Sequence, residues 1–244
     1  MADRLAGIPV SGYLSMSEIN PVELEFSRKY DYEHSLRYLR KHQDGRVRRL
    51  SHWRDMQLAR NALARAGDPE LVLDLPCGAG RFWPLLAESA NRVILAADNS
   101  ADMLTVARAF QAPEVVARVK TFQTSAFAID LGDNAVDCIF CIRLLHHVQA
   151  AENRLLILRE FHRVTRDTVI LSLWVDGNYQ AWRRQRLERQ RMTEGRSGEN
   201  QNRFVVPRAV IEDEFRQAGF QILAYQDFLP GYALWRIYVL RKTR

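Results

Sequence analysis

Lysine is scarce in this sequence of 244 residues: only 4 of its 35 basic residues are lysine, and the other 31 are arginine. Two explanations fit this bias. A GC-rich genome favours arginine codons everywhere, whereas arginine selected for bidentate binding of phosphate or carboxylate groups is concentrated where the ligand binds. The distribution of the arginines along the chain therefore distinguishes the two explanations.

Cysteine is also rare, with three residues at positions 77, 138 and 141, which excludes a disulfide framework. Cys138 and Cys141 have the spacing of a redox pair, but they fall in an apolar run. Residues three apart on a strand face opposite sides of the sheet, so we interpret both as core residues. The six histidines show no metal-ligand spacing, and no metal is expected.

Long apolar runs are absent as well. No run reaches the length of a membrane span, and residues 1–21 lack the apolar segment of a signal peptide. We therefore expect a cytoplasmic protein with no membrane span.

The most informative stretch is Val72–Phe82, with the sequence VLDLPCGAGRF. It predicts a buried strand over 71–75, a tight glycine-rich loop and a helix over 81–87. Glycines at 78 and 80 expose bare backbone to a ligand. A nicotinamide-binding turn needs a third glycine at position 83, where this chain has Trp83. The loop therefore indicates a nucleotide ligand, but not the pyrophosphate of a dinucleotide.

Asp74-x-Pro-x-Gly-x-Gly80 resembles motif I of the class I S-adenosylmethionine (SAM) methyltransferases, in the variant with proline in place of the first glycine. The segment Asp98–Leu104 is similar to the family signature D-x-S-x-x-M-L, and Asp98 follows Asp74 by 24 residues. The segment 133–148 resembles the fourth strand and the L-H-H-[VL] motif of the branch that acts on small molecules.

The resemblance implies an α/β fold: a Rossmann-like, seven-stranded, mostly parallel sheet flanked by helices, with an N-terminal helical extension and an arginine-rich insertion after the fifth strand. We expect an N-terminal arm and helical cap over 1–66 and the methyltransferase domain over 67–244, with the insertion at about 178–205. The further elements that we expect are helices over 31–43, 47–66, 152–164 and 206–219, strands over 92–97, 119–124, 136–142, 169–174, 220–228 and 232–241, and a turn at 166–167.

The resemblance also implies SAM as the cofactor. Asp98 would accept hydrogen bonds from the ribose hydroxyls, and Met103 would lie near the adenine. Ser125 stands where the family more often has an acidic residue that binds the adenine amino group. The expected cofactor-binding residues are Asp74, Pro76, Cys77, Gly78, Ala79, Gly80, Asp98, Asn99, Met103, Ser125, Ala126, Phe127, Ile142 and Arg143.

Methyl transfer from SAM requires an aligned nucleophile and removal of a proton, and no single side chain of this sequence must be catalytic. His146 is the candidate base. Packing of the imidazole beneath the pocket is the alternative.

Two segments concentrate the arginines. Residues 28–65 carry a net charge of +7 and residues 182–208 a net charge of +5, so the rest of the chain has −6 within the total of +6. Codon usage alone does not predict this clustering. We expect an anionic acceptor or ligand to bind these segments, with a solvated basic face as the alternative. The expected residues are Arg37, Arg40, Arg46, Arg48, Arg49, Arg183 and Arg184.

Three functions remain open at this stage. The first is SAM-dependent methylation of a small, anionic or phosphorylated acceptor. The second is a regulatory protein with a methyltransferase fold that binds an anionic nucleotide, such as a cyclic dinucleotide, and acts on a protein partner. The third is an RNA methyltransferase, which the basic charge favours. Nucleic acid is the less favoured partner, because the sequence shows no aromatic-basic motif and no appended RNA-binding module.

Overall fold

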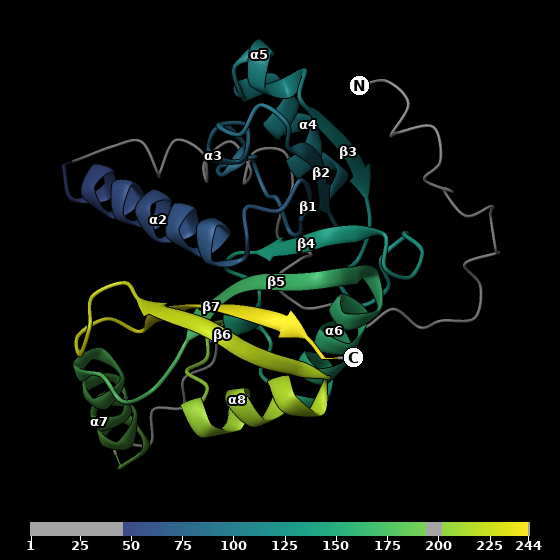
Figure 1. Cartoon of the computed structure of the whole chain (residues 1–244). Coiled ribbons are helices and arrows are strands. Elements are labelled where there is room, and N and C mark those ends of the chain that lie inside the picture. Colours follow the sequence, from purple (N-terminus) through teal and green to yellow (C-terminus); the bar gives the residue numbers. More distant parts are fainter. Residues whose placement is uncertain (1–45, 194–201, 244) are drawn as a thin grey trace.

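The computed structural model describes residues 46–193 and 202–243 and has a seven-stranded sheet at its centre (Figure 1). The strands are β1 (Leu71–Asp74), β2 (Val93–Asp98), β3 (Val119–Gln123), β4 (Val136–Cys141), β5 (Thr165–Trp174), β6 (Phe220–Asp227) and β7 (Trp235–Lys242). The helices are α2 (Arg46–Arg65), α3 (Trp83–Leu86), α4 (Ala101–Phe110), α5 (Pro113–Val116), α6 (Ala151–Val164), α7 (Tyr179–Thr193) and α8 (Arg208–Gln217), with a 3₁₀ turn, η3 (Leu145–His147).

The strand order is β3-β2-β1-β4-β5-β7-β6. The first five strands in this order pair in parallel, and β7 runs antiparallel to both β5 and β6. This arrangement confirms the predicted mostly parallel sheet. The direction of strand order reverses between β1 and β4, and open α/β sheets bind ligands at the carboxyl ends of the strands beside such a switch point.

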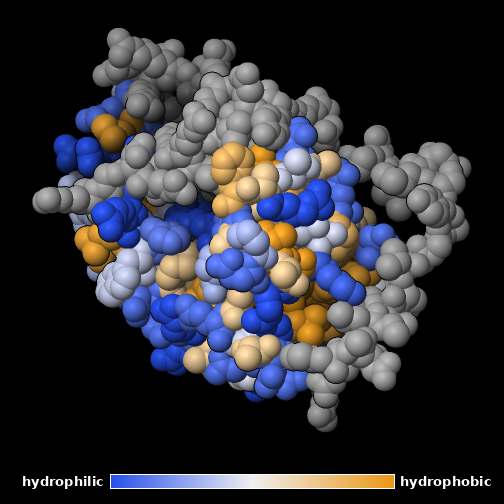
Figure 2. All heavy atoms as spheres, turned by 90° about the horizontal axis from the view of Figure 1, so that it is seen from above, coloured by the Kyte–Doolittle hydropathy of each residue, from blue (hydrophilic) through white to orange (hydrophobic). Residues whose placement is uncertain are grey.

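Helices cover both faces of the sheet, with α6 and α8 on one face and α2, α3 and α4 on the other (Figure 1). Val72 and Leu73, neighbours on β1, are both fully buried and belong to different core clusters. Burial on both faces explains why the parallel strands are continuous apolar runs rather than alternating ones. Viewed from above, hydrophilic side chains surround small groups of hydrophobic ones among the described residues (Figure 2).

Helix α2 confirms the helix predicted over 47–66. Leu58, Ala62 and Leu63 bury its second half in the core, whereas Leu50 and Trp53 in its first half are exposed. The helix predicted over 31–43, with Arg37 and Arg40, lies outside the described residues. The division of the chain at residues 66 and 67 stays a prediction.

Two local predictions were wrong in extent. The helix expected over 81–87 is a single turn, α3, and Pro84 is its second residue. The turn expected at 166–167 lies inside β5, where the register shifts opposite Asp137. Arg166 stabilises this bulge, because its Nη2 donates to the Ala135 carbonyl at 2.9 Å and its Nε lies 3.3 Å from Asp137 Oδ1. A bulge absorbs extra residues without ending a strand.

Helix α7, Tyr179–Thr193, lies in the segment after β5 that we expected to be an arginine-rich insertion. Residues 194–201 lie outside the description. Within the described ranges, no helix combines the length and the apolar composition that crossing a membrane requires.

Candidate functional site

A pocket opens at the carboxyl ends of β1 to β5 and is closed on one side by the start of β7. All of the predicted cofactor-binding residues except Asp74 and Gly80 line it, and so does His146. The lining residues that sequence reasoning missed are Leu75, Arg81, Phe82, Ser100, Thr124, Leu144, His147, Trp174, Arg203 and Trp235.

The loop after β1 has two glycines with different tasks. Gly78 has a φ of +53°, and a Cβ added to it would meet nothing within 4 Å, so the pocket reaches its backbone. Gly80 has a φ of +71°, and its added Cβ would lie 2.7 Å from Cδ2 of Trp83. The fully buried Trp83 ring therefore requires Gly80. We expected both glycines to face the ligand, but only Gly78 lines the pocket.

Asp98 joins the loops that follow β1 and β2. Its Oδ2 accepts a hydrogen bond from the Gly78 N–H at 2.9 Å, and its Oδ1 accepts one from the Ser100 N–H at 2.9 Å. Each oxygen keeps a further lone pair for a ligand hydroxyl. Ser100 in turn caps α4 by accepting from the Met103 N–H at 3.3 Å.

Asp74 lies behind this loop and is buried, and its Oδ2 has no hydrogen-bond partner in the described part of the chain. Burial raises the pKa of Asp74 well above its usual value, and the nearby Asp98 carboxylate raises it further. Burial also raises the pKa of Asp98, although the backbone N–H groups of Ser100 and Gly78 offset part of the shift. A cationic ligand would stabilise both ionised carboxylates. This end of the pocket therefore fits SAM, which carries an ammonium and a sulfonium group.

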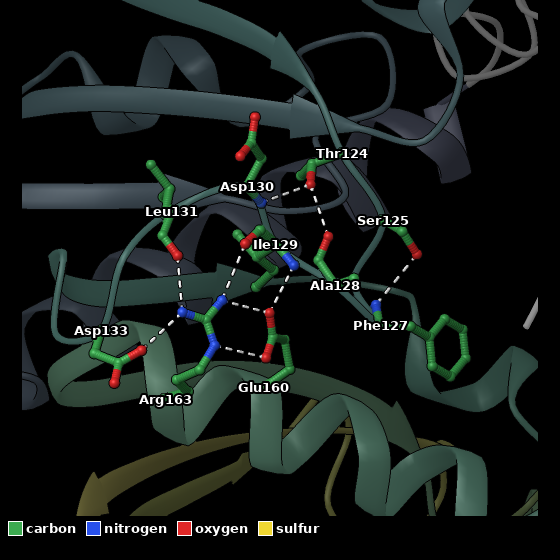
Figure 3. Close-up of polar contacts among 10 residues, drawn as sticks. All are labelled: Thr124, Ser125, Phe127, Ala128, Ile129, Asp130, Leu131, Asp133, Glu160 and Arg163. Atoms are coloured by element: carbon green, nitrogen blue, oxygen red, sulfur yellow. Dashed lines mark hydrogen bonds and ion pairs between the residues drawn. The ribbon is translucent and has the colours of Figure 1, made fainter. Parts of the chain in front are cut away.

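The loop after β3 contributes Ser125, Ala126 and Phe127 to the pocket. Figure 3 shows Ser125 and Phe127 in this loop. Ser125 Oγ already accepts a hydrogen bond from the Phe127 N–H at 3.2 Å. The hydroxyl proton of Ser125 is therefore available for donation. A ring nitrogen of adenine can accept such a hydrogen bond, whereas the adenine amino group is a donor. Thr124 closes the turn, since its Oγ1 donates to the Ala128 carbonyl and accepts from the Asp130 N–H, both at 3.0 Å.

Helix α6 holds this loop in place through Glu160 and Arg163 (Figure 3). Glu160 Oε1 accepts from the Ile129 N–H at 2.7 Å, and Arg163 forms a bidentate pair with Glu160 at 2.6 and 2.9 Å. Arg163 also donates to the carbonyl oxygens of Ile129 and Leu131. This side of the pocket is therefore fixed before a ligand binds.

Arg143, directly after β4, connects the pocket to helix α2. Its φ is +71°, and its Nη2 lies 2.6 Å from Oδ2 of Asp55. Arg81 Nη2 lies 2.5 Å from the same oxygen. The Arg143 guanidinium also lies 5.1 Å from the ring centroid of Trp235. Asp55 was not predicted, because no family motif covers α2.

The far end of the pocket is aromatic. His146 is 2% exposed, and its ring centroid lies 3.9 Å from His147, 4.6 Å from Trp235 and 5.4 Å from Trp174. Burial, with smaller contributions from nearby cationic groups, lowers the pKa of His146 to about 2. The imidazole is therefore neutral at physiological pH. Its Nδ1 has no hydrogen-bond partner among the described residues.

Guanidinium groups border this aromatic end. Arg203, which lines the pocket, lies 5.7 Å from the Trp174 ring centroid, and Arg184 of α7 lies 5.3 Å from it. None of the predicted anion-binding arginines whose side chains the structure describes lines the pocket. Arg48, Arg49 and Arg183 are exposed, Arg46 begins α2, and Arg37 and Arg40 lie outside the described residues.

Comparisons with known proteins agree with this geometry. Residues 72–168 match the family model described as "Methyltransferase domain". An uncharacterized methyltransferase-like protein of Schizosaccharomyces pombe is 31% identical over 106 residues, which are 43% of this chain. The match spans only 38% of the length of that yeast protein.

Among solved structures, magnesium protoporphyrin IX methyltransferase of Synechocystis PCC 6803 with bound SAH is similar with a TM-score of 0.69 and 19% identity, over 89% of this chain and 99% of that chain. Its SAM-bound structure gives a TM-score of 0.65 and 18% identity over 92% and 100% of the two chains. The [4+2]-cyclase SpnF is similar with a TM-score of 0.58 and 15% identity, over 77% of this chain and 80% of that chain. These likenesses show a shared fold. The family match shows a methyltransferase domain over residues 72–168, and this part of the chain contains the motifs around Asp74 and Asp98.

Proposed function

We propose that this protein transfers a methyl group from SAM to a small, anionic acceptor. The observation that carries the proposal is the distribution of charge within one pocket. The buried Asp98 carboxylate lines the end formed by β1 and β2, and the buried Asp74 carboxylate lies behind this end. Arg203 and Arg143, whose Nη2 is paired with Asp55, line the end formed by β4, β5 and β7. A cationic cofactor and an anionic acceptor would each meet complementary charge.

The cofactor end would be used residue by residue. Asp98 would accept hydrogen bonds from the ribose hydroxyls with its free lone pairs, and the bare backbone at Gly78 would give the amino acid part its space. Met103 and Phe127 would flank the adenine. Asp74 does not line the pocket, so it would act through the loop and through its negative charge. SAM supplies a methyl group on positively charged sulfur, which needs mainly an aligned nucleophile.

The acceptor end favours a planar molecule with a carboxylate or phosphate group. Trp174, Trp235 and His146 offer ring faces, and Arg143 and Arg203 offer cations. We propose His146 as the group that takes the acceptor proton. A neutral imidazole of low pKa is a weak base. It suffices here because an O–H or N–H becomes strongly acidic as its heavy atom bonds to the methyl carbon.

Cofactor binding is the first test, with a pair of glycine variants. Gly78 and Gly67 both have a positive φ, +53° and +85°, and open space around an added Cβ. Each change to alanine should lower the free energy of unfolding by about 1–2 kcal/mol, because alanine tolerates this backbone poorly. Only Gly78→Ala should weaken SAM binding in isothermal calorimetry, by at least about tenfold. A folded wild-type protein that binds neither SAM nor SAH would refute the proposal.

Acceptor recognition is the second test. Methyl transfer from labelled SAM would be measured against a panel of small aromatic carboxylates and phosphates. Arg203→Gln should raise the KM for an anionic acceptor by about tenfold and change the KM for SAM little. Arg216→Gln, an exposed arginine of α8, is the matched control. Transfer that prefers neutral acceptors and ignores Arg203→Gln would contradict the anionic class.

A further inference from the structure

Helix α7 carries a second surface that the pocket does not use. It lies at the margin of the molecule beside the loop between β6 and β7 (Figure 1). Three aromatic side chains meet there, each about half exposed: Tyr179 at 48%, Trp182 at 52% and Tyr232 at 47%. The Tyr179 ring stacks on Tyr232 with centroids 5.7 Å apart and an interplanar angle of 15°, and it lies 5.8 Å from Trp182. We name these three residues the aromatic platform.

The backbone holds the aromatic platform rigidly. The Tyr179 N–H donates to the Gly231 carbonyl at 2.9 Å, and the Gln180 N–H donates to the Tyr232 carbonyl at 3.1 Å. Asn178 Oδ1 accepts from the Ala181 N–H at 2.9 Å and so caps the first turn of α7. The rings are therefore positioned before any ligand arrives, which lowers the entropic cost of binding.

A row of arginines continues the same face of the helix. Arg183, Arg186 and Arg189 follow Tyr179 by four, seven and ten residues, which is helical spacing, and all three are exposed. The Arg186 guanidinium lies 5.7 Å from the Trp182 ring centroid. Arg184, on another side, is paired with Glu188 at 3.0 Å, whereas Arg183 and Arg189 have no ion pair within the described part of the chain. Their charge is thus available to a ligand.

We propose that the aromatic platform and this arginine row bind single-stranded nucleic acid. Proteins that bind single strands without sequence preference combine aromatic rings, on which bases stack, with cationic groups that follow the phosphates. Helix α7 presents both kinds of group along about 15 Å. A duplex would hide its base faces from the rings. A membrane surface would need a continuous apolar face, but residues 183–190 of α7 are arginine, glutamine and glutamate with Leu187 as the single apolar residue. The proposal goes beyond the proposed methyl transfer and does not require the nucleic acid to be the acceptor.

The test uses the full chain and labelled ten-nucleotide single strands, poly(U) and poly(A), in fluorescence anisotropy at low salt. Both should bind saturably. Tyr179→Ala and Trp182→Ala should each weaken binding at least fivefold, since stacking one base is worth about 1–3 kcal/mol. Phe110→Ala, which removes an aromatic ring that is 49% exposed at the end of α4, is the matched control and should bind like wild type.

Salt dependence separates the arginines from the rings. Three phosphate contacts predict that the logarithm of the affinity falls with the logarithm of salt with a slope of about −2, and Arg189→Gln should reduce this slope by about 0.7. Trp182→Ala should leave the slope unchanged. The proposal is overturned if a duplex of equal charge binds as tightly as the single strand, if single mononucleotides bind as tightly as the strand, or if only anionic lipid vesicles are bound.

Discussion

The Asp98 carboxylate both accepts backbone hydrogen bonds from two loops and lines the pocket. Its two oxygens fix the Gly78 and Ser100 N–H groups, and the same oxygens face the pocket. An asparagine would keep one accepting oxygen and place an NH₂ group against one of the two N–H donors. The loop geometry and the proposed ribose contact would be lost together.

We therefore expect Asp98→Asn to bind SAM about ten to a hundred times more weakly than wild type, because hydrogen bonds to a charged group are worth about 1.5–3 kcal/mol. Isothermal calorimetry with SAM and SAH measures this loss. Asp102→Asn, an exposed acidic residue in the first turn of α4, is the control and should leave the affinity unchanged. Equal affinity of Asp98→Asn and wild type would contradict the assigned ribose contact.

His146 should make stability depend on pH. Burial holds its pKa at about 2 in the folded protein, against 6.5 for a free histidine. The unfolded chain therefore binds the proton first as the pH falls, and protonation favours unfolding below about pH 6.5. Between about pH 7.5 and 5.5 this residue alone should remove about 1.4 kcal/mol from the free energy of unfolding.

The measurement is urea unfolding at both pH values for wild type and His146→Phe, which keeps a ring among the tryptophans but cannot titrate. The other histidines titrate in both proteins and cancel in the comparison. Between about pH 7.5 and 5.5, the free energy of unfolding should fall by about 1.4 kcal/mol less in His146→Phe than in wild type. Equal losses in the two proteins would show that His146 is not held neutral.

At the scale of elements, the Asp55 carboxylate joins helix α2 to two residues that line the pocket. Asp55 lies between Arg81 and Arg143, with side chains only 12 to 25% exposed. The pair Arg60 and Glu88 joins the same helix to the residues after α3, but its side chains are 47% and 52% exposed. The two contacts have the same chemistry and differ in burial.

Asp55→Ala should therefore lower the free energy of unfolding by about 1–3 kcal/mol, because it leaves two guanidinium groups side by side without their anion. Glu88→Ala should cost less than about 1 kcal/mol, as exposed pairs do. Urea unfolding gives both values. The hydrogen-exchange rates of the α2 amides should rise more in Asp55→Ala than in Glu88→Ala. A larger loss in Glu88→Ala would reverse this assignment.

The elements differed in how far local sequence could predict them. Buried parallel strands are continuous apolar runs, so β1, β2, β4 and the core of β5 were predictable to within a residue or two. The bulge at 166–167 was not, because it depends on pairing with Asp137 on another strand. The β1 loop carries its chemistry in consecutive residues. Trp174, Arg203 and Trp235 come from segments that only the folded sheet brings together.

The aromatic platform was hidden for the same reason. Tyr179 and Trp182 are neighbours on α7, but Tyr232 comes from the loop after β6. Tyr179 and Trp182 adjoin the arginines of α7 in the sequence, but the stacked arrangement also needs Tyr232. Clustering of arginine in residues 182–208 was the only signal that pointed to this region.

At the scale of the whole molecule, cofactor binding should appear as thermal stabilisation. A ligand that binds only the folded state at a hundred times its Kd adds about 2.7 kcal/mol to the free energy of unfolding. For a chain of this size that corresponds to a rise in Tm of about 5–10 °C. Differential scanning fluorimetry with SAM and SAH measures it. The Gly78→Ala variant should show little shift at the same concentrations, and an equal shift in that variant would place the cofactor elsewhere.

The position of β7 has a consequence for the order in which the protein assembles. β7 follows β6 in the chain but lies between β5 and β6 in the sheet. During synthesis, β6 leaves the ribosome with no strand to pair with, and β5 keeps an open edge until β7 arrives. Trp235, the first residue of β7, completes the pocket wall at that moment. A nascent chain should thus carry the complete glycine-rich loop after β1 well before the pocket has its Trp235 wall.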